Sequence, residues 1–180
     1  MVGLRKASSY SKMRAVPFTR ISKQKSRSYI KTVPPQKIAK FSMGSESLFN
    51  KGKLLHCLTI VSTGHTQIRH NALEACRQYI TKKLEEELAG QFLFRVVPFP
   101  HHIQRENKML TGAGADRMQT GMQLSYGAPV GKAAIVKPNG RIFFIAVADP
   151  KAVMFARHII QQIKSKLPCK TRIIYEIKKQ

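Results

Sequence analysis

Acidic residues are scarce in this chain of 180 residues: it contains nine Asp and Glu against 32 Lys and Arg, and it has no Trp. The formal net charge is +23 at pH 7, so the folded chain repels itself. A protein with such an excess usually meets an acidic partner, either nucleic acid, an anionic membrane or an acidic protein. Hydrophobic residues make up 43% of the chain, which is enough for a packed core and excludes a purely disordered polycation.

Long apolar runs are also missing. No stretch approaches the roughly 18 apolar residues that a membrane span requires, and residues 1–20 are basic without the apolar centre of a secretory signal. We therefore expect no membrane partner. Residues 1–40 contain serines and no acidic residue, which leaves a mitochondrial transit peptide as an alternative, although Pro17, Pro34 and Pro35 interrupt any amphipathic helix.

Cysteine is rare, and its spacing is unlike that of a structural site. Cys57, Cys76 and Cys169 are widely spaced and include no C-x-x-C pair. This pattern favours buried or half-buried thiols in a reducing compartment over a disulfide framework or a zinc site. We expect no metal, no cofactor and a cytoplasmic location.

The positive charge is unevenly distributed. Residues 1–40 contain 11 Lys and Arg, no Asp or Glu and no long apolar periodicity. Such a segment buries too little apolar surface to offset its ordering entropy, so we expect it to fold only on its partner. Tyr10, Phe18 and Tyr29 stand between the cations, as stacking groups do in an RNA-bound arm. We take residues 1–52 as a basic extended arm that orders on RNA; a flexible solubilising tail is the alternative.

Residues 53–180 have the patterns of a folded α+β domain. Apolar positions four residues apart predict an amphipathic helix over 67–88 with Thr66 as N-cap, and Asp149-Pro150 marks the start of a second helix. Pro138-Asn139-Gly140 predicts a tight hairpin turn. Branched or alternating apolar runs predict strands at 54–61, 91–99, 131–137, 141–148 and 171–178.

The order of these elements is strand, helix, strand, long loop, hairpin, helix, strand. Two amphipathic helices need one apolar sheet face to cover. We therefore predict a two-layer sandwich of a mostly antiparallel sheet covered by two helices, with a long internal loop. The second face of the sheet is left for solvent or RNA.

The long loop, residues 101–128, joins two predicted strands. A loop of this length in a compact domain is unusual and is generally functional or disordered. Its glycines allow close backbone approach, and cations such as Arg105 and Lys108 suit phosphate. Two nucleotide-binding motifs are incomplete in this part of the chain. A run that begins like a dinucleotide-binding fingerprint has Arg117 in place of the third glycine, and a P-loop-like run at 127–132 has three residues between its glycines where four are required.

No set of catalytic residues emerges from the sequence. Glu106 and Asp116 are flanked by arginines, which favours the ionised carboxylate over a proton-donating acid. His101-His102 offers a general base or metal ligands, but two adjacent histidines without a nearby Cys or Asp are more typical of a surface or of RNA stacking. We therefore predict that the protein is not an enzyme and has no small-molecule substrate. An RNA-modifying or RNA-cleaving enzyme that uses His101, His102 and Glu106 is the alternative.

The same loop carries a recognisable sequence. Arg105-Glu-Asn-Lys108, followed by Thr111-Gly-Ala-Gly-Ala-Asp-Arg117 and Gly121-Met122, resembles the universal large-subunit ribosomal protein family called L ten-e in archaea and L sixteen in bacteria. The archaeal form is the closer match. Similar pieces at 5–10, 37–39, 43–44 and 67–75 extend the resemblance over nearly the whole chain.

The resemblance implies a structural constituent of the large ribosomal subunit, near the tRNA sites, that helps to position rRNA and tRNA for translation. Its partners would be large-subunit rRNA, tRNA and other large-subunit ribosomal proteins. The loop facing tRNA and the peptidyl-transferase centre would contain Gly112, Gly114, Asp116, Arg117, Gln119 and Gly121. The resemblance and the attraction of cations to phosphate together predict a set of rRNA contacts. These are Arg5, Lys6, Tyr10, Lys12, Arg14, Arg20, Lys23, Lys25, Arg27, Lys31, Lys37, Lys40, Arg69, His70, Arg105, Lys108 and Lys132.

Two departures from the family pattern and one rival interpretation remain. Family sequences commonly carry a basic residue where Gln123 and Ala128 stand here, which puts phosphate contacts at those positions in doubt. Charge alone does not separate RNA from DNA, so a general nucleic-acid binder of the chromatin type is the rival. Competition between A-form and B-form duplexes would discriminate between them.

Overall fold

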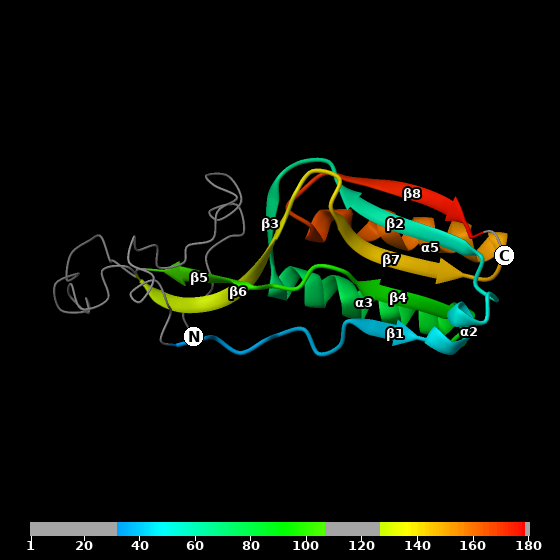
Figure 1. Ribbon diagram of the computed structural model, residues 1–180, viewed down its shortest axis with the longest axis horizontal. Coiled ribbons are helices and arrows are strands. Elements are labelled where there is room, and N and C mark those ends of the chain that lie inside the picture. The colour runs from blue at the N-terminus through cyan, green and yellow to red at the C-terminus, as the bar shows by residue number, and fades with distance from the viewer. Residues whose placement is uncertain (1–31, 107–126, 179–180) are drawn as a thin grey trace.

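The structure, a computed structural model, describes residues 32–106 and 127–178, and these form an α+β fold (Figure 1). The elements follow one another as β1 (Ser42–Gly44), α2 (Glu46–Asn50), β2 (His56–Ser62), β3 (Thr66–Arg69), α3 (His70–Leu88), β4 (Phe92–Val96), β5 (His102–Glu106), β6 (Ala128–Val136), β7 (Arg141–Val147), α5 (Pro150–Ile163), a 3-10 turn (Lys164–Lys166) and β8 (Thr171–Ile177).

Five strands form the larger sheet, the main sheet, in the order β1-β4-β7-β2-β8 with every neighbouring pair antiparallel. α3 and α5 pack side by side against one of its faces (Figure 1). The apolar stripe of α3 buries Leu73, Cys76, Ile80 and Leu84 there. Alternate strand residues such as Phe94 point into the same core. The α+β class and the antiparallel pairing predicted from the sequence are thereby confirmed.

The predicted start of the first helix is wrong. Residues Thr66–Arg69 form β3, which pairs antiparallel with Ala133–Val136 of β6, and α3 begins only at His70. Thr66 is therefore a strand residue and Arg69 is the N-cap. Pairing with a distant strand overrides the local helical period. The end of α3 agrees with the prediction, since Ala89 and Gly90 both adopt positive φ just beyond Leu88.

The predicted hairpin is also wrong, although its turn exists. The N–H of Gly140 donates to the carbonyl of Lys137 at 2.9 Å, and Asn139 takes a φ of 60°. However, β6 and β7 belong to different sheets and do not pair with each other. Ser62 holds the turn instead: its carbonyl accepts from Asn139 N–H at 2.8 Å, and its N–H donates to the carbonyl of Gly140 at 3.0 Å.

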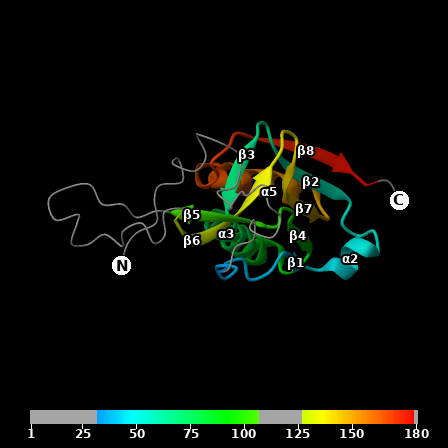
Figure 2. The ribbon, with the colours of Figure 1, turned by 60° about the vertical axis from the view of Figure 1, so that its left-hand side comes forward.

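A second sheet, the end sheet, consists of three strands in the order β3-β6-β5. It extends beyond the end of the main sheet in both views (Figures 1 and 2). The described part of the chain therefore has two sheets where the sequence predicted one. β5 and the start of β6 also lie inside 101–128, so the ends of the predicted long loop are strands, while its middle, 107–126, lies outside the described residues.

Two further elements lie within residues 1–52, the predicted arm. β1 pairs with β4 at the edge of the main sheet, and α2 begins after Ser45, whose side chain accepts a hydrogen bond from the N–H of Leu48. Before them, Ile38 is buried in the main core. This part of the chain therefore packs against the domain, and residues 1–31 lie outside the described residues.

Other local predictions are confirmed. Asp149 is the N-cap of α5 and Pro150 its first residue. Cys57 and Cys76 are buried, Cys169 is half-buried, and all three are free thiols. Burial raises the pKa of Cys76 to about 12, so this thiol stays protonated. Across 32–106 and 127–178, none of the helices has the length and apolar character of a membrane span.

Candidate nucleic-acid interface

Six of the residues predicted to bind rRNA fall in the described chain: Lys37, Lys40, Arg69, His70, Arg105 and Lys132. The predicted contacts Arg5, Lys6, Tyr10, Lys12, Arg14, Arg20, Lys23, Lys25, Arg27, Lys31 and Lys108 lie outside it, and so do the loop residues Gly112, Gly114, Asp116, Arg117, Gln119 and Gly121.

His70 is the point at which four of the six come together. It is the first residue of α3, only 4% exposed, and lies against Gly131 of β6. Burial, and then the nearby charges of Lys37, Arg69 and Lys132, lower its pKa to about 4. These three cations come from the segment before β1, from β3 and from β6. We call them, with His70, the cationic junction.

His70 itself offers RNA neither a charge nor an exposed ring. With a pKa of about 4 its imidazole is neutral near pH 7. Its contact with Gly131 instead makes it part of the packing between α3 and β6. The junction thus has the neutral His70 at its centre and three cations around it. This arrangement favours the binding of a polyanion at its surface.

Buried polar groups surround the junction. Gln104 Nε2 donates to Gln67 Oε1 at 2.9 Å across the end sheet, and both residues are 2% exposed. Within the described chain, Nε2 of Gln67, Nδ1 of His70 and Nε of Arg105 are buried without a hydrogen-bond partner. Buried donors of this kind are nearly always satisfied by protein, water or ligand, so they indicate a hydrated or ligand-bound end of the molecule.

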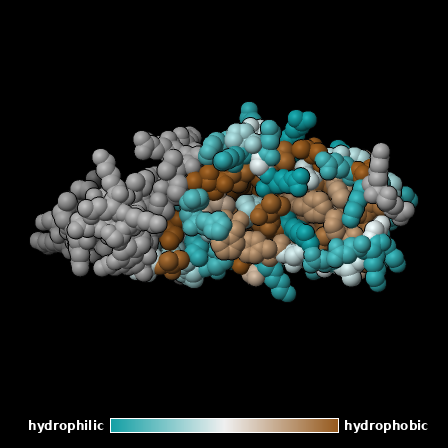
Figure 3. Space-filling model, viewed as in Figure 1, coloured by the Kyte–Doolittle hydropathy of each residue, from teal (hydrophilic) through white to brown (hydrophobic). Residues whose placement is uncertain are grey.

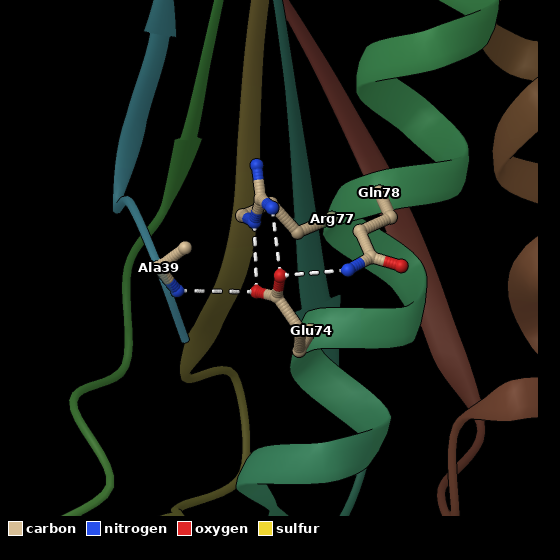
Figure 4. Close-up of polar contacts among 4 residues, drawn as sticks. All are labelled: Ala39, Glu74, Arg77 and Gln78. Carbon is tan, nitrogen blue, oxygen red and sulfur yellow. Dashed lines mark hydrogen bonds and ion pairs between the residues drawn. The ribbon is translucent and has the colours of Figure 1, made fainter. Parts of the chain in front are cut away.

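Glu74 fastens the segment that carries Lys37 and Lys40 to α3 (Figure 4). Its carboxylate accepts two hydrogen bonds from Arg77, at 2.7 and 2.8 Å, and one from Gln78 at 3.0 Å. It also accepts from the backbone N–H of Ala39 at 3.4 Å. The hydrogen bond from Arg77 is the main cause of a lowered pKa at Glu74, so the carboxylate stays ionised.

A cleft of about 540 Å³ lies beside the junction, between the β2–β3 turn and the segment that joins α5 to β8. Arg69, Lys166 and Lys170 line it, together with Thr63 and His65, and its lining contains no Asp or Glu. The cleft also reaches the start of α3, whose first turn has no acidic residue and whose N-cap side chain makes no capping bond. A helix N-terminus and three cations together favour an anionic group.

Sequence reasoning missed Lys166 and Lys170. The available signal was the density of charge around them, with three lysines in the seven residues 164–170. Only the fold shows that this segment lies beside Arg69, since about a hundred residues separate them along the chain. The ammonium of Lys166 also lies 4.9 Å from the ring centre of Tyr79.

Two of the residues proposed for the enzyme alternative, His101 and His102, lie in different surroundings. His101 is exposed, with its ring 4.6 Å from that of Phe99, whereas His102 belongs to β5. Burial is the first cause of the lowered pKa of His102, which makes it a weaker base. Among the residues that the structure describes, no group of three His, Cys, Asp or Glu could hold a metal ion.

Comparison with known proteins adds independent information. The family model described as "Ribosomal protein L16p/L10e" matches residues 16–174. A protein of Thermofilum pendens named "Large ribosomal subunit protein uL16" is 42% identical over 174 residues, covering 96% of this chain and 97% of its own. Proteins of the same name from Sulfolobus acidocaldarius and Pyrobaculum calidifontis are 38% and 37% identical, over 94% and 97% of this chain and 92% and 94% of their own.

Proposed function

The chain belongs to the ribosomal protein L16p/L10e family, and from that membership we propose that it is a structural constituent of the large ribosomal subunit, in the cytoplasm. The resemblance found in the sequence is thereby confirmed. The relatives bear the name of a large-subunit protein, so the proposed partners are large-subunit rRNA, tRNA and neighbouring ribosomal proteins. The proposed role is structural and not enzymatic.

The observation that best supports rRNA binding is the cationic junction. Lys37, Arg69 and Lys132 come from three separate segments, yet all of them act on the same buried imidazole. Cations gathered in this way neutralise phosphates and release their counterions, which supplies most of the affinity of a protein for a nucleic-acid backbone. Because A-form RNA is recognised mainly by its shape and backbone, such an interface needs little base specificity.

The organisation of the chain on RNA is part of the proposal. Residues 1–52 would act as a basic arm whose part before Ile38 orders on rRNA, and 53–180 as the α+β domain. The main sheet and its helices would form a two-layer sandwich that supports the junction. The packing of β1 and α2 on the main sheet means that the free part of the arm would precede them.

The loop between β5 and β6 would face the tRNA sites, with Gly112, Gly114, Asp116, Arg117, Gln119 and Gly121 at its functional part. Support comes from the two strands that flank it: β5 and β6 pair antiparallel and bring residues 106 and 128 together at its base. A paired base of this kind holds the two ends of a loop together on a rigid support.

The test is the salt dependence of binding to a large-subunit rRNA fragment. Each phosphate contact contributes about 0.7 on a single strand and about 0.9 on a duplex to the slope of log affinity against log salt. The double variant Lys37→Ala, Lys132→Ala should therefore reduce the slope by about 2, because it removes about two such contacts. The matched control is Lys82→Ala, Lys151→Ala, since both of these lysines lie on the helices, away from the junction. Equal slopes for the two double variants would overturn the proposed interface.

A further inference from the structure

The face of the main sheet that α3 and α5 leave uncovered carries a groove of about 550 Å³. Phe41, Phe49 and Phe144 line it together with Arg95 and Arg141. In the space-filling view, apolar side chains gather over the middle of the sheet and hydrophilic ones surround them (Figure 3). We call this feature the aromatic groove.

The rings of the aromatic groove are held in place by their neighbours. Phe49 meets Phe144 edge to face, with ring centres 5.7 Å apart and planes at 82°. Phe41 stacks on Phe99 at 5.3 Å. The ammonium of Lys178 lies 4.4 Å from the ring centre of Phe49. Ordered rings lose little entropy when a planar ligand stacks on them.

The lining of the aromatic groove contains two arginines and no acidic residue. Arg95 forms an ion pair with Glu46, and its Nε donates to Ser42 Oγ at 3.3 Å. The carboxylate of Glu46 is thus already neutralised, and the guanidinium of Arg95 is held at the groove edge. Arg141 is exposed and also lines the groove. A purely apolar protein segment would gain nothing from these cations, whereas a polyanion that carries flat rings would match both features.

We propose that the aromatic groove binds unpaired bases of RNA by stacking, as a second contact beside the cationic junction. The inference rests on the proposed function, because that function supplies RNA as the ligand. Phe144 and the planar guanidinium of Arg141 form the stacking surfaces, and Lys178, beside Phe49, takes an adjoining phosphate. An antiparallel sheet that presents aromatic residues and cations on an open face is suited to this task. The ligand is therefore single-stranded RNA, read by ring stacking with little sequence preference.

The experiment uses the full chain and a short single-stranded oligoribonucleotide that contains 2-aminopurine, whose fluorescence falls on stacking. The protein contains no Trp, so the probe signal is free of indole emission. Phe144→Leu keeps an apolar side chain but removes the ring, and it should weaken binding about tenfold and abolish the quenching. Phe155→Leu is the matched control, because Phe155 packs on the helix side of the sheet.

A second pair of measurements separates stacking from charge. Arg141→Lys keeps the positive charge but removes the planar guanidinium on which a base would stack. It should therefore weaken binding to base-bearing RNA several-fold. Neither it nor Phe144→Leu should change binding to an abasic strand of equal length. Arg141 is exposed, so this variant tests the proposal even if Phe144→Leu unfolds the sheet.

The outcomes distinguish the two proposals. Equal binding of base-bearing and abasic strands, with quenching unchanged in both variants, would overturn the stacking proposal while leaving rRNA binding intact. Absence of salt-dependent binding to either strand would overturn both. If the variants leave RNA binding unchanged but abolish co-purification of another ribosomal protein, the aromatic groove is a protein contact and the proposal is wrong.

Discussion

A β-carbon on Gly131 would lie 3.2 Å from Nε2 of His70, so the backbone of β6 passes directly against the imidazole at the start of α3. This contact joins the end sheet to the helix that supports the main sheet. It also places Lys132, the next residue of β6, near the imidazole and so within the cationic junction. The small size of Gly131 is therefore a condition for the arrangement of the cations.

Gly131→Ala should destabilise the protein by about 1–3 kcal/mol, because the new methyl group must push the His70 ring or shift β6 in a packed junction. Urea denaturation gives the free energy of unfolding directly. Gly64→Ala is the control: a β-carbon at Gly64 would meet no atom within 4 Å, so its effect should stay within about 0.5 kcal/mol. Equal stabilities of the two variants would contradict the close contact.

The stability of the protein should fall as pH falls from 6.5 to 4. The pKa of His70 is lowered from 6.5 to about 4 in the folded protein, so the unfolded chain binds a proton in this window before the folded chain does. The stability contributed by neutral His70 is therefore present above pH 6.5 and is lost progressively down to about pH 4, with a total of about 3 kcal/mol.

The measurement is urea denaturation of the wild type across this pH range, compared with His70→Gln and His65→Gln. His70→Gln should flatten the pH dependence, since it removes the titrating group. His65→Gln should not, because His65 is exposed. A wild-type profile equal to that of His70→Gln would show that burial does not hold His70 neutral. Bound RNA should raise the pKa of His70, because phosphates offset the charges of Lys37, Arg69 and Lys132.

Glu74→Gln should loosen the segment that carries Lys37 and Lys40. The substitution removes the charge that receives the hydrogen bonds from Arg77 and the Ala39 N–H. Unfolding should become easier by about 1–2 kcal/mol, and amide exchange at Ala39 should accelerate. Glu86→Gln is the control, because its ion pair with Lys83 is solvent-exposed and such surface pairs contribute little. Exchange at Ala39 that is equally slow in both variants would show that Glu74 does not anchor the segment.

Deletion of residues 1–31 should weaken rRNA binding strongly while the domain remains folded. The deleted segment carries nine Lys and Arg and no acidic residue, and phosphate contacts dominate affinity. Deletion of residues 1–40 should in addition destabilise the fold, because it removes Ile38 from the core and the Ala39 hydrogen bond. Circular dichroism and filter binding separate the two effects. Loss of folding on deletion of 1–31 alone would mean that this segment belongs to the core.

The sequence predicts four of the five strands of the main sheet but not β1, and it predicts the end sheet poorly, for physical reasons. β2, β7 and both long helices have strong apolar patterns, which burial on one side imposes. Ile68, in contrast, continues the four-residue spacing of Ala72 and Cys76 in α3 backwards, so the local pattern does not reveal that Thr66–Arg69 pairs with β6. β5 contains one apolar residue, Ile103, and gives no strand signal although its pairing with β6 is extensive.

For the interface, composition and resemblance identify the cations but not their grouping. Lys37 and Lys132 are about a hundred residues apart in the sequence, and only the packing of β6 over His70 brings their charges to bear on one ring. The same applies to Lys166 and Lys170, which line a cleft with Arg69. The aromatic groove also depends on tertiary structure, because its phenylalanines come from the segment before β1, from α2 and from β7.

The most direct test of the large-subunit assignment is sucrose-gradient sedimentation of a native extract in high salt, with each fraction probed for this protein. A protein bound to the subunit by charge alone, through 6–10 phosphate contacts, loses roughly 10³–10⁵ in affinity between 50 and 200 mM salt. An integral constituent held by shape and by an inserted chain should remain in the large-subunit peak, near one copy per particle. Release into the light fractions would contradict the assignment and favour a general nucleic-acid binder or a transient assembly factor.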